Sequence, residues 1–141
     1  MDGTLTDVRG IRHYVMDPKN RNFHKFHRES VNCPPNVDVV EAAKADHAAG
    51  RKVLIVTARE EVYAFHTMFW LRFQGVEFDQ LYMRRKKDYR PDNIIKSEIL
   101  DIIRADGYNV VRAYDDNPSI WEVWEQNGIE TIRVQGFGFE L

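Results

Sequence analysis

Residues 53–59 read Val53-Leu54-Ile55-Val56-Thr57-Ala58-Arg59, and this stretch decides the fold class. Its first four residues form an apolar, mainly β-branched run that is too short for a helix and is typical of a buried parallel strand. An Ala-rich segment with helical spacing, residues 37–49, comes before it and ends at Gly50, which suits a helix C-terminus. A second helical pattern follows over residues 60–73. Helix, strand and helix in this order predict an α/β fold.

The same alternation continues along the chain. Strands are expected at residues 78–83, 109–114 and 130–134, and helices at residues 92–105 and 118–127. Parallel strands need crossover helices, so residues 37–141 are expected to form a mostly parallel sheet with right-handed crossovers. The helix over residues 60–73 is expected to bury an apolar face made of Val62, Phe65, Phe69, Leu71 and Phe73. The tryptophans, Trp70, Trp121 and Trp124, are expected to pack against the sheet.

Residues 1–36 differ from the rest because they are polar and contain three of the five histidines. They predict a long polar connection with one short strand or hairpin near residues 12–16. We interpret His24 and His27 as surface or substrate-loop residues, since no cysteine or second histidine pair stands at zinc spacing. No linker divides the chain, so residues 1–141 are expected to be a single domain.

The composition excludes several classes of protein. With 20 Lys and Arg against 22 Asp and Glu, the net charge of −2 gives no bulk attraction to nucleic acid or an anionic membrane. The single cysteine, Cys33, excludes an internal disulfide framework and a multi-cysteine zinc site. No apolar run is long enough for a membrane span and no secretory signal is seen, so we expect a cytoplasmic protein without membrane contact.

Polar residues gather where strands are expected to end. Asp115 and Asp116 follow the strand over residues 109–114, Thr57 and Arg59 follow residues 53–56, and Asp2 lies near the start. Ligands of parallel sheets bind beyond the carboxyl ends of the strands. Paired carboxylates there suit Mg²⁺, which phosphoryl transfer needs to neutralise charge. Purely structural interpretations remain open: Asp2-Gly3 can be a turn, Asp115-Asp116 a helix N-cap, and Thr57 an ordinary strand-end residue.

Four motifs occur in order along the chain: Asp2-Gly3-Thr4-Leu5-Thr6-Asp7, Thr57 after an apolar run, Lys96 on a helix, and Asp115-Asp116 after a strand. Together they resemble the haloacid dehalogenase superfamily of Mg²⁺-dependent phosphatases. The resemblance implies a three-layer, Rossmann-like core with no large cap domain. It also implies that Asp2 is the general acid/base, that Thr57 and Lys96 bind the transferring phosphate, and that Asp2, Asp115 and Asp116 hold Mg²⁺. On the sequence alone, Lys96 reads as a solvated helix residue.

Within the superfamily, three stretches are similar to the phosphatase domain of phage-type polynucleotide kinase-phosphatases. These are Thr57-Ala58-Arg59-Glu60, the segment from Asp92 to Glu98 that carries Lys96, and Tyr114-Asp115-Asp116 with the helix after it. The resemblance implies removal of 3′-phosphates from nucleic acid ends during repair, with a kinase or ligase as a possible partner. Arg59 and Asp92 carry over as substrate-side and supporting residues.

One position of the family pattern does not fall within the sequence. The first Asp of the family's Asp-x-Asp motif is the nucleophile, and here it would precede Met1. The resemblance therefore implies that the first, central strand and its nucleophile lie upstream of Met1, and that residues 1–141 alone are catalytically crippled. A non-catalytic phosphate-binding remnant is the alternative from another class.

One basic run stands out at residues 84–90. Arg84, Arg85 and Lys86 are interpreted as contacts to substrate phosphates, with Arg12 adding to them if the N-terminal segment folds over the site. A solvated surface loop is an equally good interpretation. Either a phosphorylated nucleic acid end or a small phosphate ester fits the chemistry, and only the former predicts activity that falls steeply with salt.

Overall fold

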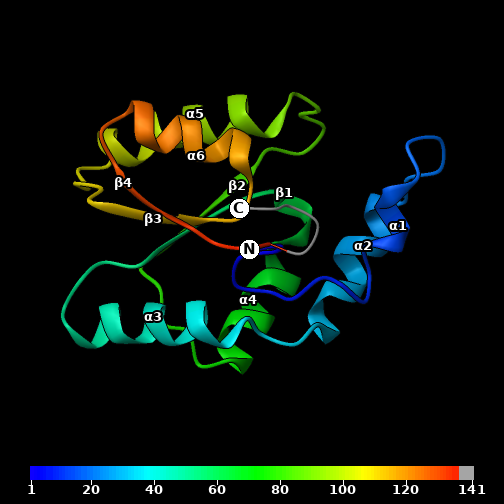
Figure 1. Cartoon of the computed structure of the whole chain (residues 1–141), viewed down its shortest axis with the longest axis horizontal. Helices are drawn as coiled ribbons and strands as arrows, with labels where there is room; N and C mark the ends of the chain where they lie inside the picture. Colours follow the sequence, from blue (N-terminus) through cyan, green and yellow to red (C-terminus); the bar gives the residue numbers. More distant parts are fainter. Residues whose placement is uncertain (137–141) are drawn as a thin grey trace.

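The computed structural model describes residues 1–136 and shows a layered α/β arrangement (Figure 1). The strands are β1 (Leu54–Glu60), β2 (Gln80–Arg84), β3 (Arg112–Asp115) and β4 (Glu130–Arg133). The helices are α1 (His13–Met16), α2 (Phe23–Glu29), α3 (Val37–Ala48), α4 (Ala64–Phe73), α5 (Asp92–Ala105) and α6 (Pro118–Gln126), with 3₁₀ turns at Ser30–Asn32 and Glu61–Tyr63. The α/β class is confirmed, and no large cap domain is present among these residues.

The strands pair in parallel, as the sequence predicts. β1 pairs with β2, and β3 pairs with β4, so the described residues form two sheets of two strands each. Helices α5 and α6 cover one face of these sheets, and α3 and α4 lie on the other (Figure 1). Successive side chains of β1 point to opposite faces of the sheet. Ile55 belongs to the hydrophobic core formed with α3 and α4, whereas Leu54 and Val56 pack against the cores formed with α5 and α6.

A cavity of about 370 Å³ lies between the two sheets. Leu54 and Val56 of β1 line one side, Val110 and Tyr114 line the other, and Met1 stands in the same lining. Within residues 1–136, β1 and β3 turn unpaired edges toward this apolar space, since neither is bonded to the other. An edge with free backbone groups beside an apolar cavity is a place where a further strand can pair.

Residues 13–16 form the helix α1 and not an extended strand, so the expected strand or hairpin near residues 12–16 is wrong. The two short helices α1 and α2 pack against each other at one side of the molecule (Figure 1). The Asn22 side chain accepts a hydrogen bond from the Lys25 amide (3.0 Å) and so caps α2. A local cap and a packing partner stabilise helices too short to be recognised from periodicity.

The apolar face expected for α4 is also wrong in part. Phe65, Phe69 and Phe73 are 73%, 52% and 78% exposed, and Val62 is exposed as well. The buried face of α4 carries Thr67, Trp70 and Leu71 instead. A helix that is apolar on several sides does not reveal from its sequence which side meets the core. The expectation that Trp70, Trp121 and Trp124 are packed inside is confirmed.

Other boundaries shift by a few residues. The expected helix at 92–105 is confirmed, and α6 begins at Pro118 with Asn117 as its cap. Strand β1 extends beyond Val56, so Thr57 and Arg59 lie within the strand rather than after it. The pairing register of β1 and β2 shifts between Thr57 and Glu60, which marks an irregularity at this end of the sheet.

Candidate active site

The first six residues form a tight loop at the edge of the sheets. The Met1 carbonyl accepts hydrogen bonds from the amides of Thr4, Leu5 and Thr6 at 3.0–3.2 Å. Gly3 has φ +78°, and a Cβ built on it would lie 2.1 Å from Oδ2 of Asp116. Only glycine fits here, because a side chain would displace the Asp116 carboxylate.

Asp2 is held by Arg59, which is 2% exposed. Nε of Arg59 donates to Oδ2 of Asp2 (2.9 Å), and Nη2 donates to Oδ1 in a bidentate pair. Nη1 of Arg59 donates to the Thr67 hydroxyl (3.0 Å), which fixes the guanidinium to α4. Burial by itself would raise the pKa of Asp2, but the charge and hydrogen bonds of Arg59 outweigh it and hold that pKa below its ordinary value. Asp2 is therefore a carboxylate at neutral pH.

His27 of α2 stands beside this pair and was not recognised as a site residue from the sequence. Its Nδ1 lies 3.9 Å from Oδ2 of Asp2, is buried and has no hydrogen-bond partner within residues 1–136. The ring packs against Tyr63 with centroids 4.9 Å apart. Burial lowers the pKa of His27 to about 4, partly offset by the attraction of Asp2. His24 and His27 were interpreted as surface or substrate-loop residues. His24 is exposed, whereas a surface position is wrong for His27, whose side chain is 14% exposed; a place in a substrate loop stays a prediction.

The lowered pKa of His27 predicts an acid-sensitive fold. An ordinary histidine protonates near pH 6.5 and His27 near pH 4, so protonation favours the unfolded chain between these values. The stabilisation is complete above pH 6.5 and is lost as pH falls toward 4. The free energy of unfolding, measured by urea titration in EDTA, is expected to drop by about 2 kcal/mol between pH 7.5 and 5.0 because of this group. His27→Gln should show a drop smaller by that amount; an equal drop in both chains contradicts the assignment.

Asp115 ends β3 and forms the second charged contact of the site. It is 4% exposed, and Nζ of Lys96 donates to its Oδ2 at 2.8 Å. The Asn117 amide donates to Oδ1 (3.2 Å), and Nε1 of Trp121 donates to the Asp115 carbonyl (2.7 Å). Burial alone would raise the pKa of Asp115, but the Lys96 charge and hydrogen bond lower it below the ordinary value. Lys96 thus reaches the strand edge from the first turns of α5, as its register implies.

Asp116 is the one carboxyl of this group that no side-chain cation pairs within residues 1–136. Its Oδ1 accepts from the Thr4 hydroxyl (2.8 Å), and the backbone at Gly3 and Gly136 closes on its Oδ2. Burial raises the pKa of Asp116 above its ordinary value; the Thr4 hydrogen bond, the Met1 amino group and Lys96 oppose this increase in part, and the charge of Asp115 adds to it. A buried carboxylate without a side-chain cation is unfavourable unless a positive group is supplied from outside.

These features fit a divalent cation only in part. Asp115 and Asp116 offer the hard oxygen ligands that Mg²⁺ prefers, and Asp116 lacks a side-chain counter-charge. The carboxylate of Asp2, however, is turned to Arg59, which leaves its backbone carbonyl as the available donor. Across residues 1–136, no three His, Cys, Asp or Glu side chains already converge on one point.

Thr57 lies within β1 and is 3% exposed. Its hydroxyl accepts a hydrogen bond from the Arg59 amide at 3.2 Å. The structure therefore places Thr57 next to the residue that holds Asp2. Its contact with a transferring phosphate stays a prediction.

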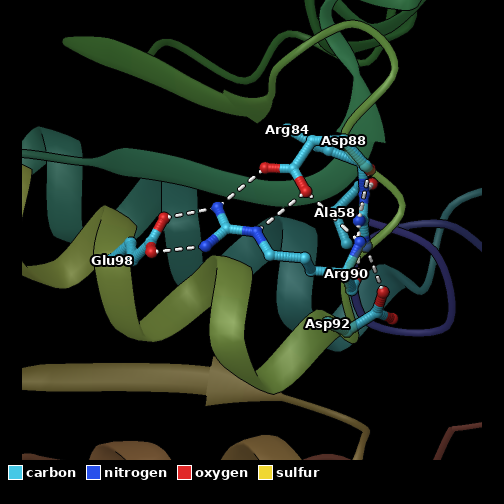
Figure 2. Close-up of polar contacts among 6 residues, drawn as sticks. All are labelled: Ala58, Arg84, Asp88, Arg90, Asp92 and Glu98. Atoms are coloured by element: carbon cyan, nitrogen blue, oxygen red, sulfur yellow. Dashed lines mark hydrogen bonds and ion pairs between the residues drawn. The ribbon is translucent and has the colours of Figure 1, made fainter.

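Arg84 has a role within the chain itself. Figure 2 shows it at the centre of the loop that precedes α5, where it donates to the carbonyls of Ala58, Asp88 and Arg90 at 2.6–2.7 Å. It also pairs with Asp92 at 2.6 Å. These four bonds occupy most of its donors, so Arg84 and Asp92 fix the loop to β1. Their contact with substrate stays a prediction.

The remaining predicted substrate residues differ in exposure. Arg85 and Lys86 are exposed on the same loop, and Arg12 is half-buried just before α1. Arg90 pairs with both Asp88 and Glu98, which neutralises part of the basic run (Figure 2). The structure thus brings Asp2, Thr57, Arg59, Lys96, Asp115 and Asp116 to one edge of the sheets, and it leaves Arg85 and Lys86 on the surface.

Comparisons with known proteins show which sequences and structures the chain is similar to. The family model described as the polynucleotide kinase PNKP phosphatase domain matches residues 1–139. A putative bifunctional polynucleotide kinase/RNA ligase of Autographa californica nuclear polyhedrosis virus is 23% identical over 130 residues, which are 91% of this chain and 18% of that protein.

Two solved structures are similar over 99% of the chain. One is described as the Pnkp1/Rnl/Hen1 complex and the other as the Pnkp1/Rnl/Hen1 RNA repair complex; both have TM-scores of 0.82 and 28% identity. The chain spans 45% and 42% of those chains, so it corresponds to less than half of each. Within residues 1–136 no helix is both long and apolar enough to cross a bilayer.

Proposed function

Because the chain belongs to the family of polynucleotide kinase PNKP phosphatase domains, we propose that it removes the 3′-phosphate from nucleic acid ends with the help of Mg²⁺. The observation that carries this proposal is the cluster at one sheet edge. There the Asp115–Lys96 pair, the unpaired Asp116 and the Asp2–Arg59 pair lie together. Carboxylates and fixed cations at such an edge are what phosphoryl transfer requires.

Asp2 acts as the proton-transfer group in this proposal. The lowered pKa of Asp2 keeps it in the carboxylate form, which accepts a proton from an attacking water. Arg59 is a positioning residue, because its bidentate contact fixes the orientation of Asp2 and its own donors are turned away from solvent. Donation of a proton to the leaving oxygen would require Arg59 to release part of this contact.

Lys96 and Thr57 are proposed to bind the transferring phosphate. Asp115, Asp116 and the Asp2 carbonyl would hold Mg²⁺, which supplies the positive charge that neutralises the phosphate oxygens. A kinase or ligase domain is proposed to act beside this one, because one relative is described as a putative bifunctional polynucleotide kinase/RNA ligase and a similar structure is a Pnkp1/Rnl/Hen1 complex.

The cavity between β1 and β3 supports a further element of the proposal. Two unpaired parallel edges face an apolar space whose lining includes Met1. A parallel strand in this space would end at Met1 and would present the residue before Met1 beside Lys96 and Asp115. The family pattern implies that this residue is the aspartate nucleophile.

The test is Mg²⁺-dependent phosphate release from a 3′-phosphorylated oligonucleotide by two forms of the protein. One form is the chain of residues 1–141, and the other carries the upstream residues of the source reading frame, ending in Asp before Met1. We expect release by the longer form only, with little release from a 5′-phosphorylated oligonucleotide or from glycerol phosphate. Release by the short form that is lost in Asp2→Asn would show that the nucleophile lies within residues 1–141. If neither form releases phosphate from any of these substrates, the proposed function is overturned.

A further inference from the structure

The segment of residues 9–28, here called the basic hairpin, contains α1 and α2 and has a charge unlike the rest of the protein. It holds six Lys and Arg residues and a single acid, Asp17. The other residues hold fourteen Lys and Arg against twenty-one Asp and Glu. A strongly positive element on a negative body creates a local field that attracts polyanions.

The basic side chains of this segment are available to a ligand. Lys19, Arg21 and Arg28 are exposed, and none of them forms an ion pair with another residue in 1–136. The guanidinium of Arg21 lies 6.0 Å from the ring centroid of Phe23, which is itself 51% exposed. An exposed aromatic ring beside exposed cations is the combination that binds single-stranded nucleic acid, because bases stack on the ring while cations contact the backbone.

The basic hairpin is joined directly to the candidate active site. His27 of α2 lies 3.9 Å from Asp2, and Nδ1 of His24 is 2.8 Å from the Tyr63 hydroxyl. The His27 side of α2 therefore borders the site, while Arg28 on the same helix is exposed. A strand bound along the hairpin would lead to the catalytic edge.

The other basic segment of the chain is a weaker candidate. In the run at 84–90, Arg84 donates hydrogen bonds to backbone carbonyls and pairs with Asp92, and Arg90 pairs with Asp88 and Glu98. The backbone amides of Lys86 and Lys87 face the carboxylates of Glu61 and Glu60 at 3.4 and 3.3 Å. These acids reduce the positive field at the run. In the basic hairpin Arg9 is paired with Asp7, but Lys19, Arg21 and Arg28 form no ion pair with another residue in 1–136.

We propose that the basic hairpin binds the single-stranded polynucleotide that leads to the phosphorylated end, with a base stacked on Phe23. This inference rests on the proposed function for the substrate class, but it concerns binding and not turnover. The polynucleotide is recognised by its phosphate backbone and base faces, so single-stranded DNA and RNA are both ligands.

The test measures binding of a fluorescein-labelled, single-stranded 20-nucleotide oligonucleotide to the chain of residues 1–141 by anisotropy. The variant Lys19→Ala/Arg21→Ala/Arg28→Ala is expected to weaken binding about 100-fold at 0.1 M salt and to reduce the slope of log K against log salt by about 2. Phe23→Leu keeps an apolar side chain and is expected to weaken binding about tenfold with an unchanged salt slope. Circular dichroism checks that each variant is folded.

Two matched triple variants serve as controls. Lys44→Ala/Lys52→Ala/Arg72→Ala removes the same charge elsewhere on the molecule and is expected to change binding by less than threefold. Arg85→Ala/Lys86→Ala/Lys87→Ala tests the other basic segment. The inference is overturned if either control loses as much as the hairpin variant, or if poly-glutamate of equal charge binds as tightly as the oligonucleotide. The binding assay does not depend on turnover. Oligonucleotide binding without phosphate release would support this inference and overturn the proposed function, so the two can fail separately.

Discussion

Replacing Asp116 by Asn is expected to abolish phosphate release while leaving the fold as stable as before or more stable. The Asn side chain keeps the volume and can still accept the hydrogen bond from Thr4. It removes a buried charge that no side-chain cation balances within residues 1–136, and burial raises the pKa of this carboxyl in the native chain. Loss of one preorganised electrostatic group in such a site lowers turnover by about 10²–10³-fold.

The measurement combines phosphate release by the longer form, which carries the residues upstream of Met1, with thermal unfolding at several Mg²⁺ concentrations. Mg²⁺ is expected to raise the melting temperature of the unchanged protein and to have little effect on Asp116→Asn, since a ligand stabilises only the state that binds it. Asp101→Asn is the matched control, because Asp101 is exposed on α5 and has no partner within residues 1–136. A variant that retains its response to Mg²⁺, or that unfolds in proportion to its loss of activity, speaks against a metal role for Asp116.

Replacing Arg59 by Ala is expected to cause the largest loss of stability of any substitution at the site. Arg59 is buried, and its removal leaves the Asp2 carboxylate and the Thr67 hydroxyl without their main donor. Removing one partner of a buried ion pair costs about 3–5 kcal/mol. Because the Asp2 side chain is 22% exposed, water can solvate it in part, and we expect a loss near the lower end, about 3 kcal/mol.

Two further variants separate charge, geometry and exposure. Arg59→Lys keeps the positive charge but cannot make the bidentate contact, so it is expected to recover only part of the stability. Arg90→Ala also removes an arginine with two acidic partners, but its side chain is 48% exposed, so the loss of stability is expected to be much smaller than for Arg59→Ala. Urea unfolding at pH 7.5 measures all three. Equal losses for Arg59→Ala and Arg90→Ala would show that burial does not decide the strength of these pairs.

The elements that the sequence predicted well are those with strong local signals. The helix over residues 92–105 has isoleucines at helical spacing, and the helix at Pro118 has Asn117 as a cap; both were located correctly. The α1 and α2 helices were missed because segments of only four and seven residues carry too little periodicity. The exposed phenylalanines of α4 were assigned to the core because periodicity shows that a helix has an apolar side but not what it meets.

The candidate site divides in the same way. Thr57 and Asp115-Asp116 were singled out because they follow predicted strands, and Asp2 and Lys96 because of their order in the family resemblance; the roles of all of them stay predictions. Nothing in the sequence indicated that Arg59 binds Asp2 and Thr67, that Arg84 holds a loop, or that His27 is buried beside Asp2. The partners in these contacts are separated by up to 57 residues, so no local pattern connects them.

The sequence by itself determined the α/β class, the order of the main helices and strands from residue 37 onward and the identity of the carboxylates at the strand ends. These depend on short-range preferences of neighbouring residues, which the chain carries wherever it folds. Only the tertiary structure decided which side of α4 is buried and which arginines are free for a ligand. It also decided that Asp116, unlike Asp2 and Asp115, forms no ion pair with a cationic side chain within residues 1–136. Burial and ion pairing are properties of groups brought together from distant positions, and they become defined only when the layers have packed.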